Sequence, residues 1–172
     1  MPDHAATPAF RSKTLTAALA FFFGGLGAHR FYLHGMRDVF GWLHLLATVA
    51  GVVGVQRLTG SHLQSGTGWL YAAAGYVSVL AALLAAIVYG LRPDAKWDAR
   101  FNAVPADADA DAKADADADA AGGGGERHSH SGWTVILIVM AALFVGASIL
   151  MGGLAIGMQT YFEAQLGQSG LH

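Results

Sequence analysis

Four long stretches of the chain carry no charged residue, and polar segments separate them. They cover residues 14–28, 39–56, 68–91 and 133–162. A helix needs about 20 apolar residues to cross the roughly 30 Å hydrocarbon core of a bilayer, and the last three stretches approach or exceed this length. The pattern predicts an all-α, polytopic helical membrane protein with about four transmembrane helices, of which the first two form an N-terminal hairpin.

The first apolar stretch is short for a membrane crossing. Its 15 residues make a helix of about 22 Å. We expect the helix to continue through residues 29–33, with Arg30 extending its side chain towards the headgroups; a locally thinned bilayer is the alternative. A secretory signal peptide is a further alternative, because Arg11 and Lys13 precede the stretch. The hydrophobic run that follows directly favours a retained helix.

The polar segments divide the chain further. Residues 92–104 place Trp97 and Phe101 four positions apart, on one face of a short helix suited to the membrane surface. Alternating Ala and Asp followed by glycines cannot bury enough apolar surface to fold, so residues 105–131 are expected to be a disordered linker. The predicted organisation is a polar tail (1–13), the hairpin (14–57), a loop and third helix (58–91), an interfacial helix (92–104), the linker (105–131), a fourth helix (132–162) and a C-terminal tail (163–172).

Composition supports a membrane protein and excludes several chemistries. Of 172 residues, 54% are hydrophobic and 13% charged, against roughly one quarter charged in soluble domains. Six of the twelve acidic residues lie within residues 107–119. The chain has no cysteine, which excludes thiolate metal sites and a cysteine nucleophile. The basic residues are scattered, so we expect no nucleic-acid partner.

The basic residues also predict an orientation. If all four helices cross, the loops after the first and third lie on one side and contain most of the Lys and Arg. The positive-inside rule then places these two loops in the cytoplasm and both termini outside. The loops hold Arg30, Arg37, Arg92, Lys96, Arg100, Lys113 and Arg127, whereas the opposite side holds Arg11, Lys13 and Arg57.

The most specific motif joins the first two helices. An apolar helix ends in glycines at positions 24, 25 and 27 and is followed by His29-Arg30-Phe31-Tyr32. Over residues 13–54 this pattern resembles the TM-two domain (two-transmembrane domain) family, in its bacterial-type form with a His-Arg-Phe-Tyr loop. The resemblance implies two membrane helices joined by a short loop, and a topology more than an activity. His34 departs from the Tyr-Leu-Gly common in the family.

The motif provides the candidate site. Glycines let the helix end approach a neighbouring backbone closely, while Arg30 can pair with lipid phosphate or with a carboxylate such as Asp38. The residues expected to contact lipid or a partner protein are His29, Arg30, Phe31, Tyr32 and Arg37. The plainer alternative is that the motif only anchors the hairpin at the membrane interface.

Other polar and small residues are weaker candidates. His44 lies inside a span, either as a functional group or as a neutral imidazole bonded to a neighbouring helix. The pair His128 and His130 has too few ligands for a structural metal site. Residues expected to serve helix packing are Gly24, Gly25 and Gly27 in the hairpin and Gly153 and Gly157 in a GxxxG pattern, which is also typical of homo-oligomers.

These observations favour a structural or interaction protein of the cell (inner) membrane, whose partners are the lipid bilayer and a membrane protein or a second copy. A small transporter or channel subunit that acts as an oligomer is the alternative. An enzyme ranks last, because the spans contain no catalytic pair of titratable groups. The sequence predicts no catalytic residue, metal or cofactor.

Overall fold

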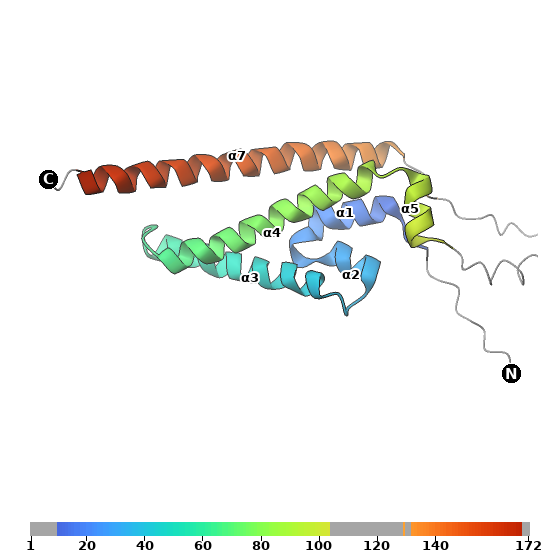
Figure 1. Cartoon of the computed structure of the whole chain (residues 1–172), viewed down its shortest axis with the longest axis horizontal. Helices are drawn as coiled ribbons and strands as arrows, with labels where there is room; N and C mark the ends of the chain where they lie inside the picture. Colours follow the sequence, from blue (N-terminus) through green and yellow to red (C-terminus); the bar gives the residue numbers. More distant parts are fainter. Residues whose placement is uncertain (1–9, 104–128, 130–131, 170–172) are drawn as a thin grey trace, which may run out of the picture.

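The computed structural model describes residues 10–103, 129 and 132–169. Every regular element in these ranges is a helix, which confirms the all-α prediction (Figure 1). Three helices are long and apolar enough to cross a membrane, namely α3, α4 and α7. In chain order the elements are α1 (Lys13–Phe23), the 3₁₀ turn η1 (Gly24–Leu26), α2 (Ala28–His34), α3 (Val39–Gly60), α4 (Gly66–Leu91), α5 (Asp94–Phe101) and α7 (Trp133–Ser169).

The antiparallel pair of α3 and α4 forms the centre of the molecule. The two backbones touch where Gly51 faces Gly75, and a Cβ on either glycine would overlap the Cα of the other. Gly54 lies against the backbone of Ala72 in the same way. Small residues permit such close approach in membranes, where helix association depends on van der Waals packing.

Helix α7 packs on α4 with its first half and then leaves the bundle. Val135 and Ala142 are buried, and the hydroxyl of Tyr76 donates to the carbonyl oxygens of Ile149 and Leu150, each at 3.1 Å. Beyond this point most side chains of α7 are exposed. The helix continues to Ser169, so residues 163–169, expected to begin a tail, extend it.

The first helix differs from the expectation, because it turns back instead of crossing. The backbone N–H of Ser12, just before α1, donates to the hydroxyl of Tyr32 near the end of α2 at 2.9 Å. The guanidinium of Arg11 lies 5.4 Å from the centre of the Tyr32 ring. Helix α1 therefore runs from the end of the molecule that holds Ser12 towards the middle. There η1 turns the chain, and α2 runs back towards the same end (Figure 1).

The turn reaches about the middle of the spanning helices. Gly24 lies against Ala82 of α4, and Gly25 lies against Thr48 of α3. Thr48 is nine residues, or about 14 Å, from the start of α3, and Ala82 is nine residues from the end of α4. Half of a bilayer core is about 15 Å, so the turn lies near the midplane.

This path gives the molecule two unlike ends. The proximal end holds the start of α1, the α2–α3 turn, the end of α4, α5 and the start of α7; the distal end holds the α3–α4 turn and the end of α7 (Figure 1). The start of α1 and the α2–α3 turn thus lie at the same end. The prediction that they lie on opposite sides of the membrane disagrees with the structure.

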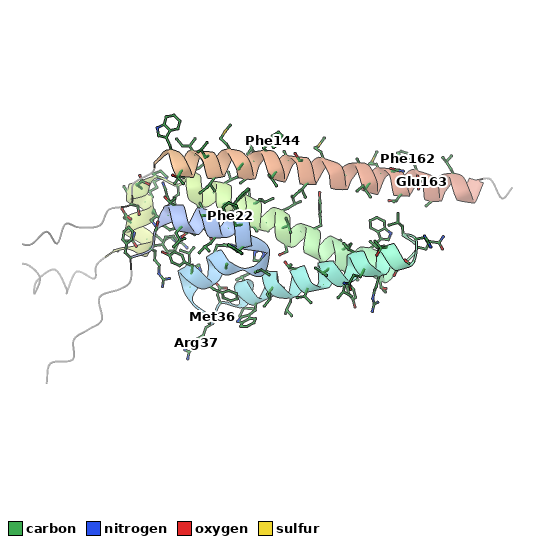
Figure 2. The ribbon with its side chains drawn as sticks, turned by 180° about the vertical axis from the view of Figure 1, so that it is seen from behind. Phe22, Met36, Arg37, Phe144, Phe162 and Glu163 are labelled. Carbon is green, nitrogen blue, oxygen red and sulfur yellow. The ribbon has the colours of Figure 1, made fainter. Side chains whose placement is uncertain are left out.

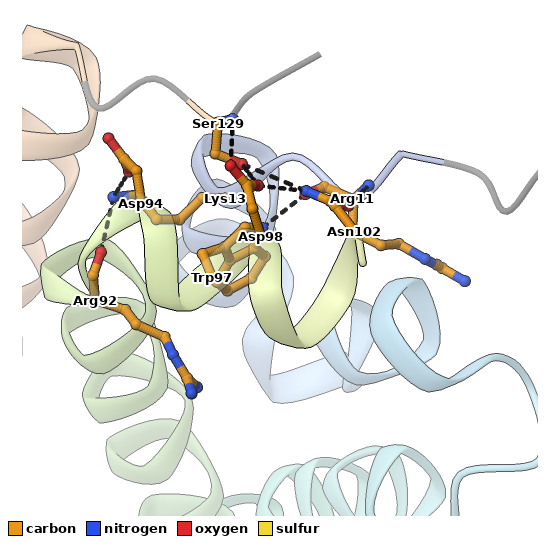
Figure 3. A network of polar contacts seen from close by, with 8 residues as sticks. All are labelled: Arg11, Lys13, Arg92, Asp94, Trp97, Asp98, Asn102 and Ser129. Carbon is orange, nitrogen blue, oxygen red and sulfur yellow. Dashed lines mark hydrogen bonds and ion pairs between the residues drawn. The ribbon is translucent and has the colours of Figure 1, made fainter. Parts of the chain in front are cut away.

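Helix α5 is tied to the protein at the proximal end. Trp97, expected to face the membrane surface, is fully buried, and its indole N–H donates to the carbonyl of Arg11 at 2.7 Å. Asp98 accepts from the Ser129 hydroxyl at 2.6 Å and from the Asn102 amide at 2.7 Å. Lys13 pairs with Asp94, as Figure 3 shows. The network joins α1, α5 and Ser129, which lies four residues before the start of α7.

Candidate functional site

The α2–α3 turn is built around one carboxylate. Asp38 caps α3 by accepting from the backbone N–H of Phe40 at 2.8 Å, as expected of Asp at a helix start. The same side chain pairs with the Arg30 guanidinium at 2.9 Å and lies 3.1 Å from Nδ1 of His34. Asp38 therefore joins α2 to α3. The pairing of Arg30 with Asp38, one of the expected partners, is confirmed.

Charge and burial act in opposite directions on this carboxyl. Burial raises the pKa of Asp38, but the hydrogen bonds from Arg30 and from the N–H of Phe40 outweigh it and hold the pKa below its usual value. Arg30 also lies over the ring of Phe40, with 4.9 Å from its guanidinium carbon to the ring centre. The charged pair is thus covered on one side by an aromatic ring.

Aromatic packing fixes the same turn from its other face. The Phe31 ring lies against Gly41 of α3 and 5.5 Å from the Trp42 ring. The indole N–H of Trp42 donates to the carbonyl of Met36 at 2.9 Å. Gly35 has φ +78°, which favours glycine, and opens the turn. The turn is therefore held in one shape while Met36 and Arg37 remain exposed.

His29 does not lie where the sequence suggested. Its side chain is 1% exposed, so its ring does not contact lipid or a partner in this structure. The ring centre lies 5.4 Å from that of His44 and 6.1 Å from that of Tyr89. Its Nδ1 has no hydrogen-bond partner among the described residues. The physical reason is the return of α2, which presses His29 between α3 and α4.

Residues 9–61 match the family model of the TM2 domain. This segment is a TM2 domain. The match confirms the resemblance seen in residues 13–54, and it leaves α4, α5 and α7 outside the domain. No curated protein and no solved structure matches the chain.

The glycines of the TM2 domain serve close packing, as their motif implies. A Cβ on Gly24 would overlap the side chain of Ala82, and one on Gly25 would crowd the hydroxyl of Thr48. Gly27 has φ +74° and lies against the carbonyl of Gly41, so both its conformation and its surroundings require glycine. These contacts let η1 wedge between α3 and α4.

The two glycines expected to pack in α7 have different surroundings. A Cβ on Gly153 would overlap the Tyr76 ring, so this glycine packs within the chain. Gly157 has open space, with nothing within 4 Å of an added Cβ. Of the two glycines in the GxxxG pattern, Gly153 therefore packs against α4, whereas Gly157 packs against no described residue.

His44 of the TM2 domain bonds to a neighbouring helix, as its plainer interpretation predicted. Its Nδ1 lies 2.8 Å from the hydroxyl of Ser78 in α4. Among the described residues no three His, Cys, Asp or Glu side chains are placed to hold a metal. The pair His128 and His130 lies outside the described residues.

Sequence reasoning missed the residues that complete the hairpin. The hydroxyl of Thr48 donates to the carbonyl of Gly25, and the hydroxyl of Ser78 lies 2.8 Å from Nδ1 of His44. A small polar side chain inside an apolar helix was the available signal for Thr48 and Ser78, because such groups seek partners on neighbouring helices.

Proposed function

We propose that the chain is a structural or interaction protein of the membrane, without catalytic activity, that contacts lipid or a membrane-protein partner through residues 36–40. The observation that carries this is a turn with fixed geometry and exposed apolar side chains. Met36, Val39 and Phe40 are 65%, 76% and 61% exposed. Figure 2 shows Met36 and Arg37 pointing away from the helices.

The fixed shape of this turn supports a role in contact. Asp38 and Trp42 hold the backbone on both sides of Arg37, so little conformational entropy is lost when the exposed side chains meet a partner. A binding surface placed on a rigid scaffold is common for loops that carry function. The His29 imidazole is buried against His44 and Tyr89, so it contributes to packing and not to this contact surface.

The distribution of charge supports a cytoplasmic proximal end in the cell (inner) membrane. Of the basic residues that the structure describes, Arg57 alone belongs to the distal half. The positive-inside rule then assigns the proximal end to the cytoplasm. The proximal residues are Arg11, Lys13, Arg30, Arg37, Arg92, Lys96 and Arg100.

Site-specific photo-crosslinking in native cells tests this proposal. A photoreactive amino acid at Met36 should capture a reproducible partner, protein or lipid, that mass spectrometry identifies. A probe at Leu63, 52% exposed in the distal turn, is the matched control and should not give the same adduct. Arg30→Ala should abolish capture at Met36 without changing capture at Leu63. Equal capture at both positions would overturn the proposal.

A specific observation also favours a transport subunit as second candidate. His29, His44 and Ser78 meet between three helices, and ionisable residues inside a membrane often mark an ion path. Oligomerisation would have to complete such a path. Proton or cation flux into proteoliposomes that is lost in His44→Phe, but retained in the exposed control Leu43→Phe, would establish this function in place of the first.

A further inference from the structure

An apolar groove lies under the turn that joins α1 to α2. Its volume is about 220 Å³, and its walls come from the end of α1 with η1, from α3 and from α4. Beyond the groove, the distal halves of α3 and α4 carry exposed apolar side chains, among them Val52, Val55 and Leu70. The residues that matter for its chemistry are Phe22, Leu26, Thr48, Val79, Ala82 and Leu83.

The lining suits a hydrocarbon. Thr48 has the only polar side chain of the lining, and its hydroxyl already donates to the carbonyl of Gly25. The other side chains of the lining are apolar, as the burial of a hydrocarbon requires. An apolar cavity of about 150 Å³ is large enough to hold benzene. The groove therefore has room for the end of an alkyl chain.

Depth identifies which hydrocarbon reaches the groove. The turn lies near the midplane, opposite the middle of α3 and α4. Phe22 and Leu26 are 67% and 47% exposed at the edge of the groove, and Figure 2 places Phe22 well inside the length of the molecule. Acyl chains of both leaflets end at this depth, since each leaflet contributes about half of the roughly 30 Å core. Helix α1 occupies the proximal side of the turn (Figure 1), which leaves the distal leaflet to supply the chain.

We propose that the groove is a lipid site, in which the terminal part of an acyl chain from the distal leaflet lies under the α1–α2 turn. The chain completes the packing that α1 leaves unfilled when it stops at half depth. The groove is partly open rather than an enclosed cavity, so a chain enters it without leaving the bilayer. This inference is independent of residues 36–40 at the membrane surface.

Two photoreactive phosphatidylcholines test the site on the unmodified, full-length protein in vesicles. One carries a diazirine on the last carbons of an acyl chain and the other carries it next to the glycerol ester. The terminal probe should label the lining, above all Leu26 and Val79, at least threefold more than the ester-proximal probe does. Equal labelling by both probes would overturn the assignment, because the groove would not select chain ends.

A pair of variants in α4 then tests the groove itself. Val79→Phe fills the groove, whereas Val77→Phe adds the same ring to a side chain that is 62% exposed outside it. Labelling of Leu26 by the terminal probe should fall at least threefold in Val79→Phe and stay unchanged in Val77→Phe. Unchanged labelling in a folded Val79→Phe protein would refute the site. The two-probe comparison decides alone if Val79→Phe does not fold.

Discussion

Helices α1 and α7 both begin at the proximal end and are both apolar, yet α7 alone continues to the distal end. Helix α1 is held by polar contacts at its start and by glycine contacts at its end, through Lys13, Gly24 and Gly25. Helix α7 has few buried residues, and its distal half is exposed. The comparison shows that contacts with neighbouring helices decide how far an apolar segment travels across the bilayer.

The largest expected effect is all-or-none, and it concerns the membrane face from which cysteines on either side of α1 are labelled. The chain contains no cysteine, so single cysteines introduced at Phe10, Met36 and Gln64 can be labelled without background. A membrane-impermeant maleimide should reach Phe10→Cys and Met36→Cys from the same face and Gln64→Cys from the other. Labelling of the first two from opposite faces would show that α1 crosses.

The next largest effect should be the loss of stability when glycines near the end of α1 are substituted. Gly27→Ala places a Cβ against the Gly41 carbonyl in a left-handed conformation, which we expect to cost roughly 3 kcal/mol or more. Gly35→Ala has positive φ but open space, so roughly 1–3 kcal/mol is expected. Gly60→Ala, helical and open, should lose nothing. Thermal unfolding in detergent gives this order, and a harmless Gly27→Ala would contradict it.

In α7 the same substitution should act differently one turn apart. Gly153→Leu overlaps the Tyr76 ring and should destabilise the packing of α7 by roughly 1–3 kcal/mol. Gly157→Leu meets open space and should leave the melting temperature unchanged. Size-exclusion chromatography of both variants adds a second readout. A Gly157→Leu protein that changes from oligomer to monomer would place a second copy on this face.

The smallest effect should come from the charge of Asp38. Asp38→Asn keeps an N-cap but removes the pair with Arg30, which we expect to cost about 1 kcal/mol at neutral pH. Because folding lowers the pKa of this carboxyl, its contribution is present above the unfolded value of about 3.9 and is lost as pH falls through the lower folded value. The difference between wild type and Asp38→Asn should disappear below that pH. A difference in the free energy of unfolding that stays the same at every pH would show that the charge of Asp38 does not contribute.

Much of this fold could be predicted from local pattern. Apolar length was enough for α3, α4 and α7, and the motif was enough for the TM2 domain. The turn after α1, which sends α2 back towards the proximal end, was not predictable in this way. It depends on Tyr32 reaching Ser12 and on the depth at which Thr48 meets Gly25, and both contacts join residues that are distant in the chain.

The same limit applies to the candidate site. An ion pair eight residues apart, Arg30 with Asp38, was visible as opposite charges beside a glycine turn. The burial of His29 was not, because it follows from α2 lying between two helices whose register the sequence does not state. Tertiary placement therefore decided which motif residues face outward.

The carboxylate of Asp98 has a practical consequence for the architecture of the chain. It binds Asn102 and Ser129 together, so the residues that flank positions 103–128 meet at one point of the helical body. The entropy needed to close a loop between two fixed points grows only with the logarithm of its length. We therefore expect that a whole reporter domain inserted between these positions, or a much shorter connection, would leave the helices in their places.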